Sequence, residues 1–129
     1  MNTKQLERLF VVAGLYDGLL GLSFLLAHDR IFAFFEVAPP NHPAYVEFPA
    51  LLLMIFGALF VHIATDPKRH RNLIPYGMAL KASYVFLAFW YHATSGIPAM
   101  WLPWAWMDLG FLFAFAYAWW SISKERSAT

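Results

Sequence analysis

Apolar residues dominate four stretches of the chain, each about 20 residues long and separated from the next by a more polar segment. These stretches run over residues 9–28, 46–65, 73–92 and 101–122. An α-helix rises about 1.5 Å per residue, so a helix of about 20 residues crosses the roughly 30 Å hydrocarbon layer of a bilayer. The pattern therefore predicts an all-α integral membrane four-helix bundle, with residues 1–129 forming a single transmembrane domain.

The three segments between the apolar stretches are predicted to be loops, at 29–45, 66–72 and 93–100. The first of them contains three prolines, which a helix interior does not tolerate. It also contains an apolar run at 31–35 that is too short to span a membrane. We expect this run to form a half-turn that lies at the headgroup level or folds over the bundle.

Positive charges are distributed unequally between the two ends of the predicted helices. Of the nine Lys and Arg residues, Lys81 lies inside a span and Arg30 lies in the first loop. The other seven all fall on the opposite side from Arg30: Lys4, Arg8, Lys68, Arg69, Arg71, Lys124 and Arg126. Because cytoplasmic loops carry an excess of Lys and Arg, both termini are predicted to be cytoplasmic.

Composition supports a membrane protein and argues against several other classes. With 60% apolar and only 13% charged residues, a chain of 129 residues has more apolar surface than one small core can hide from water. The lipid bilayer is therefore the expected partner, in a multi-pass protein of a bacterial inner membrane. A net charge of +1 gives no basic field for nucleic acid, and the absence of cysteine removes disulfides and thiolate metal sites.

Three ionisable residues lie inside the predicted spans: Asp17, Lys81 and Asp108. Each costs about 2.5–3.5 kcal/mol near the bilayer centre unless it is paired. Counted along their helices, Asp17 and Lys81 have the same depth, which predicts an ion pair between them. Asp108 should lie roughly 10 Å nearer the external side, where it either shares the ammonium or presents a second carboxylate outward. The trio is either a structural lock or a site for a ligand or proton.

Helical spacing extends this polar group into a candidate binding site. One face of the third predicted helix carries Lys81 together with Tyr84, Ala88 and Tyr91, which we call a stripe. A stripe on the second predicted helix carries Glu47 and His62, and His62 is expected to be a core residue. We expect the polar interior to open toward the external side or sideways to the outer leaflet, with a bulky residue at Ala88 blocking it. The candidate ligand-binding residues are Asp17, Lys81, Tyr84, Asp108, Tyr91 and Glu47.

Two further groups of residues bear on helix packing and on metal binding. Gly14 and Gly18 form a small-xxx-small pair, with Gly21 one turn on, and this spacing predicts a close helix–helix approach. The external histidines His28, His42 and His92 show no recognised ligand spacing, so no metal site is predicted. No cofactor can be assigned, and no catalytic motif indicates an enzyme.

The chain resembles the DoxX-like group of small four-span membrane proteins along nearly its whole length. The resemblance rests on Arg8-Leu9 followed by Gly14, Gly18 and Gly21, on the run from Asn72 to Gly77 with Lys81, and on Ile97-Pro98 through Trp101 and Pro103 to Asp108-Leu109. It implies four spans with cytoplasmic termini and an association with respiratory or quinone-linked membrane complexes. The sterol-isomerase-like four-helix proteins have a similar bundle, but their catalytic acids have no matching positions here.

Several functions remain open from the sequence alone. The leading one is binding of a lipid-like or quinone-like molecule at the intramembrane polar site. The alternatives are an accessory subunit of a larger membrane complex, an enzyme acting on a lipid-soluble substrate, and proton or ion transfer, the last of which would require a homo-oligomer.

Overall fold

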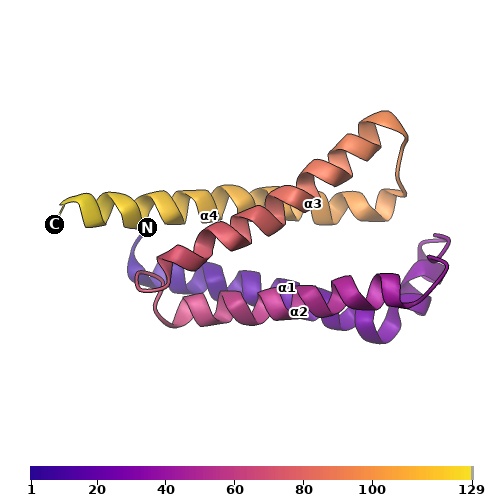
Figure 1. Ribbon diagram of the computed structural model, residues 1–129, viewed down its shortest axis with the longest axis horizontal. Coiled ribbons are helices and arrows are strands. Elements are labelled where there is room, and N and C mark those ends of the chain that lie inside the picture. Colours follow the sequence, from indigo (N-terminus) through magenta and orange to yellow (C-terminus); the bar gives the residue numbers. More distant parts are fainter. Residues whose placement is uncertain (129) are drawn as a thin grey trace.

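A computed structural model describes residues 1–128 of the protein, which form four long helices and two single turns of 3-10 helix (Figure 1). The helices are α1 (Thr3–Phe34), α2 (Ala44–Thr65), α3 (Ile74–Thr94) and α4 (Leu102–Ala128), and the short turns η1 (Arg71–Leu73) and η2 (Ala99–Trp101) precede α3 and α4. Each long helix is apolar and long enough to cross a membrane. The prediction of an all-α protein with four candidate membrane spans is therefore confirmed.

The helices are arranged as two hairpins that lie side by side, α1 with α2 and α3 with α4 (Figure 1). Both termini and the α2–α3 connection lie at one end of the bundle, which we call the terminal end. The α1–α2 and α3–α4 connections lie at the other end, which we call the loop end. Helix α3 is inclined and diverges from α4 toward the loop end, so the bundle is widest there.

Helix α1 is longer than its apolar stretch predicts. It begins with a capping box, in which the Asn2 side chain accepts from the Gln5 backbone N–H and the Gln5 side chain accepts from the Asn2 N–H. It kinks at Ala27, whose φ of −135° is not helical, and then continues to Phe34 through residues expected to be loop. The prediction of a loop beginning at residue 29 was therefore wrong.

Residues 31–34 belong to α1 and do not form the half-turn predicted for residues 31–35, and within this run only Phe32 is buried. The Phe32 side chain is 3% exposed and contacts the rings of Phe24 and Trp101, with ring centroids 6.4 and 6.1 Å away. Together with Met100 these residues form an apolar cluster at the loop end. Because of the kink at Ala27, the last part of α1 places Phe32 over part of the loop end.

A second apolar cluster joins the two hairpins at the terminal end. At its centre Phe10 of α1, Phe60 of α2 and Phe115 of α4 are fully buried. The ring centroid of Phe115 lies 4.9 Å from that of Phe10 and 5.0 Å from that of Phe60. The protein is thus tightly packed at the terminal end and only partly covered at the loop end, and the site described below lies between the two clusters.

Small residues bring α1 and α2 together, as the glycine spacing predicts. A Cβ atom added to Gly14 would lie 2.8 Å from the carbonyl oxygen of Gly57 and 2.7 Å from Cγ2 of Val61. Both distances are shorter than van der Waals contact, so only glycine fits this crossing without a shift. At Gly18, one turn along α1, an added Cβ would meet no atom within 4 Å.

This difference predicts unequal effects for two matched substitutions. We expect Gly14→Ala to lower the free energy of unfolding by about 1–3 kcal/mol, because the α1–α2 backbones must move apart. Gly18→Ala should leave it unchanged or raise it, because alanine also favours the helix. Unfolding in a denaturing detergent, followed by tryptophan fluorescence, measures both. Equal losses for the two variants would contradict the close crossing at Gly14.

Candidate functional site

The three charged residues inside the spans meet at one point between the hairpins. The Lys81 Nζ of α3 donates to Asp17 Oδ1 of α1 at 2.6 Å and to Asp108 Oδ1 of α4 at 2.9 Å. Lys81 is 0% exposed, Asp17 1% and Asp108 7%. The predicted Asp17–Lys81 ion pair is confirmed, and of the two arrangements considered for Asp108 the structure shows the shared ammonium.

The Asp108 carboxylate lies nearer to the other two charges than predicted from the sequence. Counting residues from the ends of the spans placed it roughly 10 Å outward of them. In the structure one ammonium reaches both carboxylates. A lysine side chain carries its charge several ångströms from its own backbone, so charges at different helix positions can meet.

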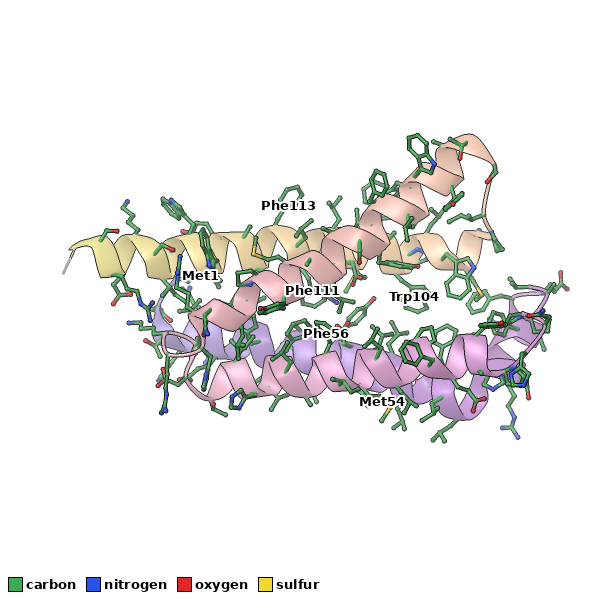
Figure 2. The ribbon with its side chains drawn as sticks, viewed as in Figure 1. Met1, Met54, Phe56, Trp104, Phe111 and Phe113 are labelled. Atoms are coloured by element: carbon green, nitrogen blue, oxygen red, sulfur yellow. The ribbon has the colours of Figure 1, made fainter. Side chains whose placement is uncertain are left out.

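Aromatic rings surround the ammonium on the side of the terminal end. The Lys81 Nζ lies 5.4 Å from the ring centroid of Tyr16, 5.7 Å from that of Phe60 and 5.2 Å from that of Phe111. Figure 2 shows Phe111 in the space between the two hairpins. Rings at this distance attract a cation and exclude water from it. Tyr16 and Phe111 are not among the site residues predicted from the sequence. Their positions give a signal, because Tyr16 adjoins Asp17 and Phe111 lies three residues after Asp108.

On the side of the loop end, the ion cluster borders a cavity of about 570 Å³ between the hairpins. Asp17, Asp108 and Tyr84 provide its polar wall, whereas Lys81 does not line it. The other lining residues are Leu20, Phe24, Phe32, Val37, Ala38, Pro40, Tyr45, Val46, Pro49, Ala50, Leu52, Leu53, Leu80, Pro98, Trp101 and Trp104. The cavity is therefore mostly apolar, and its polar groups lie together at the end formed by the two carboxylates.

The lining residues that are also exposed show where the cavity opens. At the loop end these include Pro40, Pro98 and Tyr45, which is 67% exposed. Leu52 of α2 also lines the cavity and is 36% exposed. It lies eight residues into α2, or about 12 Å from the start of that helix. The mouth of the cavity thus lies at the loop end, and exposed lining residues extend from there along α2 to Leu52.

The structure brings some of the predicted site residues to this cavity and not others. Tyr84 lines it, and the Tyr84 hydroxyl donates to the backbone oxygen of Trp101 at 2.7 Å. Tyr91 is 48% exposed and does not line the cavity, because α3 has diverged from α4 at that level (Figure 1). Ala88 is buried but does not line the cavity either, so it is not the point at which bulk would block it.

The stripe predicted on α2 faces away from the site. The inward face of this helix carries Ala50, Gly57 and Phe60, whereas Glu47 is half-buried outside the cavity lining. The expectation that His62 is a core residue was wrong: its side chain is exposed, and its ring centroid lies 4.2 Å from that of His70. The ionisable groups of α2 therefore do not contribute to the polar end of the cavity.

Trp104 belongs to the site although its sequence context indicates a ring anchored at the membrane interface. It lies four residues before Asp108, which is one helical turn on the same face of α4. Trp104 lines the cavity, and Figure 2 shows it between the two hairpins. The spacing from Asp108 is the signal that could have identified it.

Comparison with known proteins gives no match to a family model, a curated protein or a solved structure. The resemblance to the DoxX-like group therefore stays a prediction. The function of the site has to be inferred from its own geometry and chemistry.

Proposed function

We propose that the protein binds a lipid-like or quinone-like amphiphile within the membrane, with the polar head of the amphiphile at Asp17 and Asp108. The observation that carries this proposal is the cavity of about 570 Å³ that ends on the two carboxylates bound by Lys81. Ligand pockets typically have volumes of about 300–1,000 Å³, mostly apolar walls and a few convergent polar groups. The cavity has each of these properties.

The walls of the cavity favour an apolar tail. Leucine, valine, phenylalanine and proline side chains make up most of its lining. An opening along α2, where the exposed Leu52 lines the cavity, would let a molecule dissolved in the bilayer reach the cavity without crossing water. We therefore propose a ligand that partitions into membranes and binds with its tail toward the mouth.

The ion cluster supports a binding role over a purely structural one. A lock between α1, α3 and α4 would use all three charges, but it would not require them to border an open space. Here both acidic residues form part of the cavity wall. Intramembrane ionisable groups that border a cavity typically mark a substrate or ion site.

We further propose that the terminal end is cytoplasmic and that the cavity opens toward the external half of the membrane. The clustering of Lys and Arg at the terminal end supports this orientation. Reporter fusions at the carboxyl terminus should be active only as cytoplasmic reporters, and a cysteine replacing Arg30 should react with an impermeant thiol reagent added outside intact cells. An external carboxyl terminus would contradict the orientation.

The binding proposal is tested by identifying what the protein retains during purification. We expect protein solubilised in a mild detergent to carry about one tightly held amphiphile per chain, released by organic solvent and identified by mass spectrometry. The control is an unrelated four-span protein purified from the same membranes. An extract that contains only the bulk phospholipids of the control, in the same proportions, would overturn the proposal.

A further inference from the structure

We infer that the head group of the bound amphiphile is a neutral hydroxyl, as in an alcohol or a phenol, held between Asp17 and Trp104. This inference rests on the proposed binding function and specifies the chemistry of its ligand. It comes from two buried polar atoms of opposite kind that lack hydrogen-bond partners and belong to residues lining the same cavity.

The first of these atoms is an acceptor. Asp17 is 1% exposed, and its Oδ1 accepts the hydrogen bond from Lys81, but its Oδ2 has no hydrogen-bond partner in the described part of the chain. A buried carboxylate oxygen without a donor is unfavourable, because it has lost its hydrogen bonds to water. Because Asp17 lines the cavity, a donor on a ligand can supply the missing bond.

The second atom is a donor. The Trp104 Nε1 is buried and, among the described residues, also lacks a partner. Trp104 lies one helical turn from Asp108, and Asp108 shares the Lys81 ammonium with Asp17. The donor and the acceptor therefore lie at the same polar end of the cavity, and both residues line it. The remaining unpartnered atom, the hydroxyl of Tyr16, belongs to a residue outside the cavity lining.

Of the common head groups, a hydroxyl satisfies both atoms at once, because it donates one hydrogen bond and accepts others. An ether, an ester or the carbonyl of an oxidised quinone has no donor, so it would leave Asp17 Oδ2 unpaired. A protonated amine has no acceptor, so it would leave the indole N–H unpaired. A fatty acid or a phosphate would place a negative charge beside two carboxylates. A reduced quinol meets the requirement, whereas its oxidised quinone does not.

The experiment compares two probes that differ only in the hydroxyl hydrogen, para-octylphenol and its methyl ether para-octylanisole. Dissociation constants are measured for the full chain in lipid nanodiscs by native mass spectrometry. We expect the phenol to bind the wild type roughly ten to a hundred times more tightly than the ether, because the ether leaves a buried acceptor unpaired. Octylamine, tested in parallel, should bind more weakly than the phenol.

Two matched variants test the role of Trp104. Trp104→Phe keeps an aromatic ring but removes the N–H, so we expect it to weaken phenol and ether binding alike, roughly tenfold, because the oxygen of either probe can accept that hydrogen bond. The preference for phenol over ether, which depends on Asp17 Oδ2, should stay as in the wild type and shows that the cavity is still folded. Trp106→Phe is the control, because Trp106 is 61% exposed and does not line the cavity. It should change neither affinity.

Three other outcomes would overturn the inference, and the binding of the three probes tells them apart. Equal binding of phenol and ether to the wild type would show a cavity without hydroxyl recognition, which overturns the inference and leaves the proposed function standing. Tighter binding of octylamine than of the phenol would show a site for cations instead. Failure of all three probes to bind would overturn the proposed function together with the inference.

Discussion

Lys81→Met is expected to destabilise the protein more than any other single substitution at the ion cluster, lowering the free energy of unfolding by about 3–5 kcal/mol. Lys81 provides the positive charge for both Asp17 and Asp108, and all three side chains are buried. Without it, two carboxylates face each other in a medium of low dielectric constant. The measurement is unfolding in a denaturing detergent, followed by tryptophan fluorescence.

The matched variants separate the charge from the packing. Asp17→Asn leaves one carboxylate with one ammonium, so it should cost less than half as much as Lys81→Met. Combining Asp17→Leu and Asp108→Leu with Lys81→Met removes all buried charge, and it should recover most of the lost stability. The shared ammonium makes this triple variant necessary, because replacing Asp17 and Lys81 alone leaves Asp108 unpaired. Equal losses for the lysine and aspartate single variants would contradict a shared cluster.

The second large effect is expected when the cavity is filled from both sides. Leu53 of α2 and Leu80 of α3 line it, and replacing both with tryptophan adds bulk to two of its walls. We expect Leu53→Trp with Leu80→Trp to reduce the amphiphile retained during purification at least roughly tenfold, because an overfilled site leaves no room for a tail. The measurement is the amount of released amphiphile per chain.

The control adds the same two rings where they face lipid. Ile55 of α2 is 63% exposed and Leu87 of α3 is 50% exposed, and neither lines the cavity. Ile55→Trp with Leu87→Trp should retain the amphiphile at the wild-type level. Both double variants should unfold cooperatively, which separates blocking from misfolding. Undiminished occupancy in the Leu53 and Leu80 variant would place the ligand elsewhere.

The sequence predicted the spans and the ion cluster because both follow from the cost of placing groups in lipid. Four runs of about 20 apolar residues can be read without knowing how helices pack. An isolated charge in the hydrocarbon is expensive, so Asp17 and Lys81 had to find partners. The small residues of α1 likewise indicated a close contact, although not that α2 provides it.

The inward faces of the helices were harder to predict. In water, the apolar side of a helix faces the core. In a membrane the lipid-facing side is apolar too, so the spacing of apolar residues does not show which side of a helix faces the core. The stripe containing Glu47 and His62 was therefore assigned to the interior, although the structure places Ala50 and Gly57 there. The kink at Ala27 and the inclination of α3, which together shape the cavity, have no signal in the apolar pattern.

Photochemical labelling tests the claim that an amphiphile lies between the hairpins with its head at Asp17. The probe is para-octylphenol with a diazirine in its alkyl chain, irradiated with the wild-type protein in nanodiscs, and the adducts are mapped by peptide mass spectrometry. We expect adducts on cavity residues such as Leu53 and Leu80, suppressed by excess unlabelled para-octylphenol. Adducts confined to lipid-facing residues such as Ile55 and Phe86, each 63% exposed, and insensitive to the competitor would contradict the claim.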